Sequence, residues 1–263
     1  MQKFVISAAA LVVAAGAASA KTDIMAGVSN LKQLASGGSG AFFGNDGQRG
    51  GFVTTGFEAP DYAVGALEPQ QGWVGLDTLF GLPDGGFISN ANPAAGSQHV
   101  RNSRATGSAG SFNGTFQGVT GTGATSTSIK VYLPAAAYAD YFVTGFDAGT
   151  GNFAWGVRFS YTGVVRSQGA TSGGAPIVYN QYVDLATSYD ANTGAFSINY
   201  NGANIFTGTN GFANRVFNSV LLGSDNFHLT GENGDFDNFS HVPTPGAAGL
   251  LGLGAVAGLR RRR

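Results

Sequence analysis

The sequence contains no cysteine, and charged residues make up only 11% of its 263 positions. Without a thiol the chain has no disulfide framework, no thiolate-ligated metal and no cysteine nucleophile. Its stability must therefore come from an ordinary hydrophobic core. Histidine and glutamate occur only three times each. The sequence is thus poor in the groups that most often carry out acid–base catalysis.

Glycine and phenylalanine are abundant instead, with 43 and 20 residues. Aromatic and β-branched residues favour pleated sheets, whereas glycine and asparagine favour tight turns. Apolar residues alternate with polar ones over 128–133 and over 195–200, a period of two that is typical of half-buried strands. Composition and periodicity together predict an all-β fold.

Turn residues join these strands into hairpins. Asn201-Gly202 is the strongest two-residue hairpin signal, and the polar segment 189–194 separates the strands before and after it. We therefore expect a meander of three consecutive strands. Further strands are predicted at 51–54, 72–76, 98–101, 111–118, 141–146, 153–161, 219–222 and 236–242. So many short strands with polar turns predict one two-sheet antiparallel β-sandwich over 51–242.

The first 20 residues have the layout of a secretory signal peptide. Lys3 precedes an apolar stretch, and Ala18 and Ala20 supply the small-x-small pattern at which signal peptidase cleaves. We expect a signal helix over 1–20, followed by a flexible segment over 21–50. The pattern predicts an exported protein.

The end of the chain combines a hinge, a short apolar stretch and a basic block. Pro243, Thr244 and Pro245 form the hinge, and the uncharged stretch over 247–259 is rich in glycine, alanine and leucine. It is shorter than the about 20 residues that span a membrane as a helix, and its glycines lower helix propensity. We expect a short hydrophobic helix that anchors the chain transiently, with arginines held at the cytoplasmic interface. These arginines are Arg260, Arg261, Arg262 and Arg263.

This arrangement resembles the PEP-CTERM sorting domain of bacteria that make extracellular polysaccharide. The resemblance covers 243–263 and departs from the family's Pro-Glu-Pro hinge at Thr244. It implies cleavage and transfer by a membrane-embedded protease or transpeptidase of the exosortase type. The product would end at the cell surface or in the extracellular matrix.

Removal of both predicted signals makes the remaining chain acidic. Lys3 and the four terminal arginines account for five of the 14 basic residues, so nine remain against 15 acidic ones and the net charge becomes −6. Such a domain repels nucleic-acid phosphate and anionic lipid. We therefore predict no nucleic-acid partner and expect neutral sugars, divalent cations or basic partners.

Six short motifs follow one another along the central part of the chain, at 57–67, 71–73, 98–100, 111–112, 190–202 and 235–240. In this order they resemble the concanavalin A-like and laminin-G-like jelly rolls. The resemblance spans most of the chain between the two predicted signals. It implies the architecture of lectins and glucanases.

Some proteins of that architecture hydrolyse glycans with a pair of carboxylates. None of Glu58, Glu68 and Glu232 belongs to a Glu-x-Asp-x-x-Glu strand such as those glucanases carry. The three histidines are isolated in sequence, and no metal-binding helix pattern is present. We therefore predict that the protein is not an enzyme.

Asp235 and Asp237 share one face of the last predicted strand, and two interpretations remain open. They can hold a turn, or they can contribute to a metal site, because the segment 233–238 is the densest cluster of oxygen ligands in the sequence. Calcium prefers carboxylate, amide and carbonyl oxygens. Ca²⁺ is therefore the one cofactor that the sequence leaves open.

A sugar-binding site needs an aromatic face and nearby amides. By residue type, the candidates are Trp73 and Trp155, with Asn152 and Asn201 as polar companions. Tryptophan in a sandwich is also typical of core packing, and this alternative stays open. The aromatic candidates also include Tyr138, Tyr141 and Tyr189.

Three functions are compatible with these patterns. The first is an exported, noncatalytic cell-surface or extracellular-matrix protein that binds polysaccharide. The second is a structural module that packs against other proteins of the envelope. The third is a secreted glycan-cleaving enzyme, against which the missing strand of paired glutamates argues.

Overall fold

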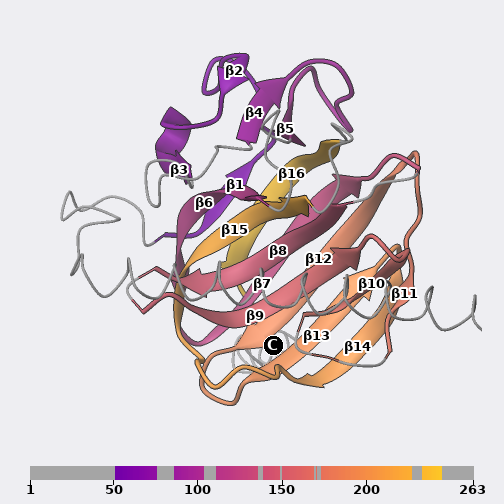
Figure 1. Ribbon diagram of the computed structural model, residues 1–263. Coiled ribbons are helices and arrows are strands. Elements are labelled where there is room, and N and C mark those ends of the chain that lie inside the picture. Colours follow the sequence, from indigo (N-terminus) through magenta and orange to yellow (C-terminus); the bar gives the residue numbers. More distant parts are fainter. Residues whose placement is uncertain are drawn as a thin grey trace, which may run out of the picture.

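The computed structural model describes residues 51–75, 86–103, 111–135, 139–148, 150–168, 170, 173–226 and 233–244. Two antiparallel β-sheets pack face to face (Figure 1). The one helical element in these residues is a 3-10 turn, η1 (Gln70–Gly72). The predicted all-β, two-sheet antiparallel sandwich is therefore confirmed.

The larger sheet contains nine strands. They are β1 (Val53–Thr55), β2 (Gly65–Ala66), β4 (Gly86–Ser89), β5 (His99–Ser103), β7 (Ala124–Tyr132), β12 (Tyr182–Asp190), β13 (Ala195–Tyr200), β14 (Ala203–Thr209) and β16 (Asn233–Pro243). Their order is β14-β13-β12-β7-β16-β5-β4-β2, and β1 also pairs with β16. β16 thus has β7, β5 and β1 as hydrogen-bonding partners.

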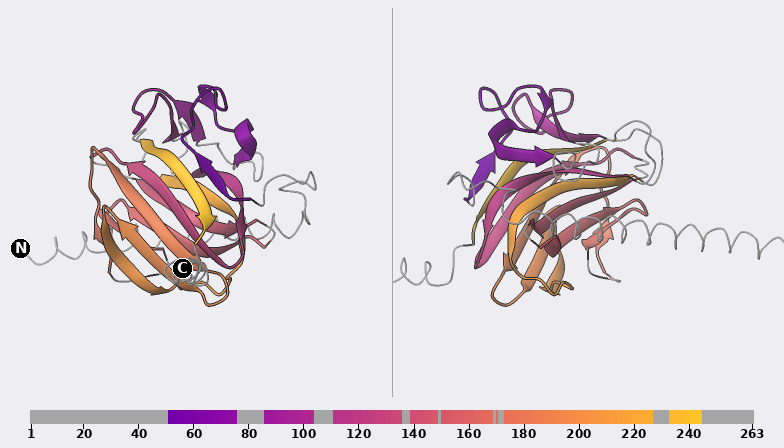
Figure 2. Two further views of the ribbon diagram at one scale, coloured as in Figure 1. Left: turned by 180° about the vertical axis from the view of Figure 1, so that it is seen from behind. Right: turned by 60° about the vertical axis from the view of Figure 1, so that its left-hand side comes forward.

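The smaller sheet contains seven strands. They are β3 (Trp73–Gly75), β6 (Ser111–Gly121), β8 (Ala139–Asp147), β9 (Asn152–Ser160), β10 (Val164–Ser167), β11 (Ala175–Pro176) and β15 (Phe217–Asn226). Their order is β11-β10-β9-β8-β15-β6-β3. Figure 2 shows the two sheets as stacked layers, with β2 to β5 gathered at one end of the sandwich.

The predicted meander is present as β12, β13 and β14, which are neighbours in the larger sheet. Asn201 and Gly202 form its second turn with φ angles of 51° and 77°. Positive φ at both central residues is what a two-residue hairpin of type I′ requires, and asparagine and glycine tolerate it best. Four strands escaped the sequence analysis, namely β2, β4, β10 and β11, which have two to four residues each.

The core lies between the sheets. It is formed by the inward-facing residues, which alternate with outward-facing residues along a strand. Ile129 and Val131 of β7, and Phe196 and Ile198 of β13, are at most 2% exposed, as their alternation predicts. Aromatic rings account for much of the filling. The largest fully buried side chains include Trp73, Trp155, Tyr141, Phe57, Phe116, Phe146, Phe159, Phe196, Phe217, Phe236 and Phe239.

β16 contains a β-bulge that determines which of its side chains reach this core. Asp237 pairs with Lys130 and Ser240 with Ser128, so two residues of β16 stand opposite one residue of β7. Asn238, at the bulge, has φ of 51°. The extra residue shifts the alternation, and Phe236 and Phe239, three positions apart, are both fully buried.

The ends of the chain were predicted to contain helical signals. The signal helix with Ala18 and Ala20, the segment 21–50, Pro245, the hydrophobic stretch and the four terminal arginines lie outside the described residues. Within those residues no helix is long and apolar enough to cross a membrane. β16 extends through Pro243, and the Thr244 N–H donates to the carbonyl of Ala124 at 2.9 Å, so the start of the predicted hinge is attached to the sheet.

The bulge makes a direct prediction about position 238. Asn238→Val should lower the free energy of unfolding by about 1–2 kcal/mol, because a side chain with a branched Cβ is strained at positive φ. Asn238→Gly should change it by only a few tenths, because glycine adopts this φ freely. Urea denaturation of both variants measures the difference. Equal stabilities of the two variants would contradict the role assigned to the bulge.

Candidate functional site

The two tryptophans predicted to face a sugar lie in the core instead. Trp73 and Trp155 are both 0% exposed. The Trp73 ring packs against Phe57 and Phe239 at centroid distances of 5.8 and 5.7 Å. Neither indole face is open to solvent, so the sugar-facing interpretation is wrong and the core-packing interpretation is confirmed. The physical reason is that each indole fills a position on the inner face of its sheet, where the strongest gain comes from burial.

Trp155 is enclosed in the same way by Phe196 and Phe217, each at 5.8 Å. The predicted polar companions, Asn152 and Asn201, do not form a groove with either indole. Asn152 begins β9 in the smaller sheet, whereas Asn201 lies in the β13–β14 turn of the larger sheet. The structure therefore does not assemble the four candidates into one site. Of the tyrosines, Tyr141 and Tyr189 are buried, and Tyr138 lies outside the described residues.

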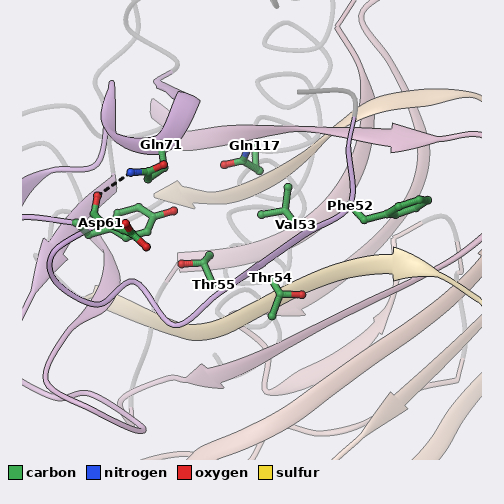
Figure 3. A pocket seen from close by; sticks show the side chains of 8 residues that line it. Phe52, Val53, Thr54, Thr55, Asp61, Gln71 and Gln117 are labelled. Atoms are coloured by element: carbon green, nitrogen blue, oxygen red, sulfur yellow. Dashed lines mark hydrogen bonds between the residues drawn. The ribbon is translucent and has the colours of Figure 1, made fainter. Parts of the chain in front are cut away.

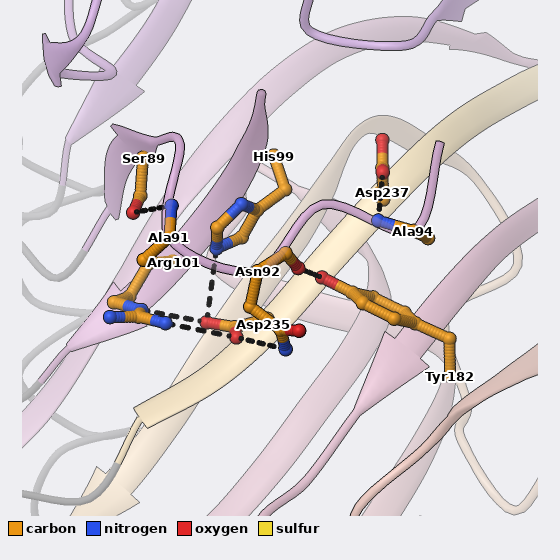
Figure 4. Close-up of polar contacts among 9 residues, drawn as sticks. All are labelled: Ser89, Ala91, Asn92, Ala94, His99, Arg101, Tyr182, Asp235 and Asp237. Atoms are coloured by element: carbon orange, nitrogen blue, oxygen red, sulfur yellow. Dashed lines mark hydrogen bonds and ion pairs between the residues drawn. The ribbon is translucent and has the colours of Figure 1, made fainter. Parts of the chain in front are cut away.

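Asp235 lies on the outer face of β16, where it is 2% exposed because the segment after β4 covers it. Arg101 donates to both of its carboxylate oxygens, from Nε at 2.8 Å and from Nη2 at 3.1 Å. The Asn92 side-chain amide donates to Oδ2 at 3.1 Å. Nε2 of His99 lies 3.4 Å from Oδ1, a long contact compared with those of Arg101. Figure 4 shows these side chains converging on the carboxylate from β5 and from the loop after β4.

Asp237, two residues further, holds backbone rather than side chains. Its Oδ2 accepts the N–H groups of Ala94 at 2.8 Å and Ala95 at 3.2 Å, and its Oδ1 accepts that of Asn238 at 2.7 Å. Tyr182 supports the same segment by donating from its hydroxyl to the carbonyl of Asn92 at 2.6 Å. Asp237 thus fixes the path of the chain between β4 and β5 (Figure 4).

Glu58 completes the set of carboxylates that hold this segment. It accepts the Ser97 N–H at 3.0 Å, the Ser97 hydroxyl at 2.7 Å and the Gln98 N–H at 3.1 Å. We call Glu58, Asp235 and Asp237 the carboxylate clamp. Sequence reasoning missed Glu58 and Arg101 because they lie far along the chain from Asp235, and no local pattern connects them.

The two aspartates of the clamp differ in their acidity. Burial raises the pKa of each carboxyl. At Asp235 the contacts of His99, Arg101 and Asn92 outweigh burial, so its pKa lies below the ordinary value of 3.8. At Asp237 the hydrogen bonds from backbone N–H groups do not fully offset the effect of burial, so its pKa lies above that value. The difference follows from the side-chain contacts of His99, Arg101 and Asn92, which reach only the carboxylate of Asp235.

The clamp matches the turn-holding interpretation of Asp235 and Asp237. Arg101 already neutralises Asp235, and N–H groups occupy the oxygens of Asp237. In the part of the chain that the structure describes, no three His, Cys, Asp or Glu residues are grouped as a metal site. The arrangement does not fit calcium, which needs six to eight oxygen ligands with free lone pairs.

An open pocket of about 510 Å³ lies elsewhere, beside β1. Figure 3 shows β1 along one side and Gln117 of β6 along the other, with Asp61 and Gln71 from the segment between β1 and β3. The residues that line it are Phe52, Val53, Thr54, Thr55, Asp61, Tyr62, Gln71 and Gln117. None of them was among the predicted site residues, although Trp73 supports the wall by donating from its indole N–H to the Tyr62 hydroxyl at 3.2 Å.

Two features of this pocket suit a ligand. Phe52 is 51% exposed, and its ring stacks on the buried ring of His241 at a centroid distance of 6.3 Å. Gln117 is 2% exposed, and its carbonyl oxygen is buried without a hydrogen-bond partner among the described residues. The exposed ring offers an apolar surface to a ligand, and the buried acceptor is a polar group whose lack of a partner is costly.

Comparisons with known proteins identify the fold. No family model matches the chain. No curated protein matches it. Among solved structures, a sialidase is similar with a TM-score of 0.58 at 6% identity over 75% of this chain, which corresponds to 19% of the sialidase chain.

Two further solved structures are similar over most of both chains. The cellulose-induced protein Cip1 has a TM-score of 0.47 at 13% identity, covering 73% of this chain and 97% of that one. Lectin II from Ulex europaeus has a TM-score of 0.45 at 10% identity, covering 74% and 99%. At such identities the likeness concerns the fold alone.

The carboxylate clamp predicts a pH dependence of stability. The lowered pKa of Asp235 means that its contribution is present above about pH 3.8 and is lost as the pH falls through its folded-state pKa. Asp235→Asn should therefore cost about 2 kcal/mol at neutral pH, since it weakens bonds to a charged partner. The difference from the unsubstituted protein should shrink towards zero in acid.

Guanidinium denaturation at a series of pH values measures this difference. Asp184→Asn is the matched control, because Asp184 is 74% exposed and its ion pair with Lys130 contributes less than about 1 kcal/mol. A gap between Asp235→Asn and the unsubstituted protein that stays constant into strong acid would contradict the clamp's electrostatic origin.

Proposed function

We propose that this protein is an exported, noncatalytic component of the cell surface or extracellular matrix that binds polysaccharide in the pocket beside β1. The observation that carries the proposal is the pocket itself, in which an exposed phenylalanine ring adjoins hydroxyl, amide and carboxylate groups. Its volume lies within the range of about 300–1,000 Å³ that small-molecule sites occupy.

The chemistry of the lining suits a sugar. One face of the Phe52 ring is supported by His241, and the exposed part offers an apolar surface to the C–H face of a pyranose. Asp61, Gln71 and the Thr55 hydroxyl can contact sugar hydroxyls. Because the pocket is open, it suits one unit of a longer chain rather than a fully enclosed monosaccharide.

Among the described residues, the positions of the carboxylates favour binding over cleavage. Asp235 and Asp237, which lie two residues apart on β16, are committed to Arg101 and to backbone N–H groups. Asp61 is the one carboxylate that lines the pocket. Hydrolysis of a glycoside ordinarily needs two. For the fold, the finer form that we propose is the concanavalin A-like jelly roll.

The destination of the protein follows from the two predicted signals. The chain would be exported by residues 1–20 and then held at the inner membrane by residues 243–263 until an exosortase-type enzyme cleaves it. Because the Thr244 N–H is bonded to Ala124 in the sheet, we place the cleavage on the C-terminal side of Thr244. The product then retains a complete β16.

Replacement of Arg260, Arg261, Arg262 and Arg263 by glutamine tests the sorting signal. In cells that possess the sorting enzyme, we expect the unsubstituted protein to lose its tail and reach the surface, and the variant to remain uncleaved. Immunoblotting of membrane and surface fractions, with mass spectrometry of the new C-terminus, measures both. An unsubstituted protein that stays intact in the inner membrane would refute this part of the proposal.

Substitution of Phe52 tests the binding site. Phe52→Ala should weaken binding to the extracellular polysaccharide of the producing cell by about tenfold, since a stacked ring contributes on the order of 1 kcal/mol or more. Phe87→Ala is the matched control, because Phe87 is a second exposed phenylalanine, 39% exposed, that does not line the pocket. Affinity electrophoresis of the exported protein gives the comparison.

The outcome also separates the proposal from its alternatives. Equal weakening by Phe52→Ala and Phe87→Ala would remove the pocket as the binding site. No polysaccharide binding together with capture of an envelope protein would favour the structural module. Release of new reducing ends from the polysaccharide would instead favour an enzyme.

A further inference from the structure

We propose that the sugar unit that this pocket selects carries a protonated amine, as in the glucosamine units of a deacetylated polysaccharide. The inference rests on the proposed function and names the chemical class of sugar for the same pocket. It follows from the hydrogen-bond acceptors that line the pocket and from the negative charge of Asp61.

Each side-chain amide of the pocket uses one of its two N–H groups within the protein. Gln71 donates from Nε2 to the carbonyl of Asp61 at 3.1 Å (Figure 3). Gln117 donates from Nε2 to the carbonyl of Gly118 at 3.3 Å. The oxygens of both amides remain as acceptors for a ligand.

Asp61 adds the one charged acceptor of the lining. It is exposed and contributes a carboxylate, which accepts hydrogen bonds and donates none when ionised. Thr54 shares its hydroxyl with Ser240 at 2.9 Å, and the Thr55 hydroxyl accepts the Phe57 N–H at 2.9 Å, which leaves its O–H as a donor. A cationic donor is thus matched to Asp61, whereas the carboxylate, sulfate or phosphate of an acidic polysaccharide would be repelled by it.

Gln117 provides the most specific part of the argument. Its carbonyl oxygen is buried and has no partner among the described residues, a state that is costly to maintain. A donor from a bound ligand would relieve it. An ammonium group offers three donors in one small group, so it can engage Asp61 and still leave a donor for a neighbouring acceptor.

Charge favours the same ligand. Asp61 is the only charged residue of the eight that line the pocket, and none of the eight is lysine, arginine or histidine. An ammonium group next to this carboxylate forms a charge-assisted bond, which is stronger than a bond between neutral groups. The exposed Phe52 ring also attracts a cation over its face. A uronate would be repelled by Asp61.

The test compares two oligosaccharides of equal length that differ only in acetylation. The full exported protein is titrated with chitosan and chitin oligomers by calorimetry at mildly acidic pH, where the chitosan amines are protonated. We expect the chitosan oligomer to bind about fivefold tighter at low ionic strength, the limit for an exposed ion pair. This preference should fall as salt is added, and an oligogalacturonate should not bind.

Asp61→Asn should abolish the preference for chitosan without abolishing binding. Asp184→Asn removes the same charge from the outer face of the larger sheet and should leave the preference unchanged. Thermal unfolding of both variants verifies that they are folded. The salt dependence of the unsubstituted protein provides a measurement that requires no substitution.

The outcomes distinguish the inference from the function on which it rests. Equal affinity for the two oligomers, or a preference that survives Asp61→Asn, would overturn the amine proposal and leave polysaccharide binding intact. Absence of binding to both oligomers and to the polysaccharide of the producing cell would overturn the amine proposal and the proposed function together.

Discussion

The pairing of β16 with three other strands is the constraint on which the rest of the structure depends. β16 joins β7 and β5 in the middle of the larger sheet and also receives β1. Its bulge at Asn238 allows Phe236 and Phe239 to enter the core together, while Asp235 and Asp237 stay on the outer face. One strand therefore organises the core, the carboxylate clamp and the strand that borders the pocket.

The connection between β16 and the pocket is direct. Thr54 of β1 shares a hydroxyl contact with Ser240, and Phe52 stacks on His241. His241 is fully buried, and its Nδ1 and Nε2 lie 2.8 Å and 2.9 Å from the Thr127 hydroxyl and the carbonyl of Thr120. Burial lowers the pKa of His241, which favours the neutral ring as the support beneath Phe52. The position of the exposed ring thus depends on a residue near the end of β16.

Local patterns made most of the fold predictable. The alternation in β7 and β13 and the Asn201-Gly202 turn depend on neighbouring residues, and each was read correctly. β2, β4, β10 and β11 were missed because strands of two to four residues are too short to show a period. The site could not be read in this way. Phe52, Asp61, Gln71 and Gln117 come from separate segments, and only the pairing of β1 with β16 and of β3 with β6 brings them together.

The surroundings of each side chain explain why the tryptophans do not face a ligand. They also explain why Asp61 differs from the other acidic residues. A large ring on the inner face of a strand is buried because removing its apolar area from water is favourable. Phe52 instead precedes β1, and only part of its ring is covered. Glu58 and Asp237 are surrounded by backbone N–H groups, which use up their oxygens in holding a segment of chain. Asp61 is exposed, and no donor among the described residues bonds to its carboxylate. A carboxylate that accepts hydrogen bonds from the protein stabilises the fold, whereas the Asp61 carboxylate can exchange bound water for the donors of a ligand. The proposed function therefore rests on this difference between Asp61 and the carboxylates of the clamp.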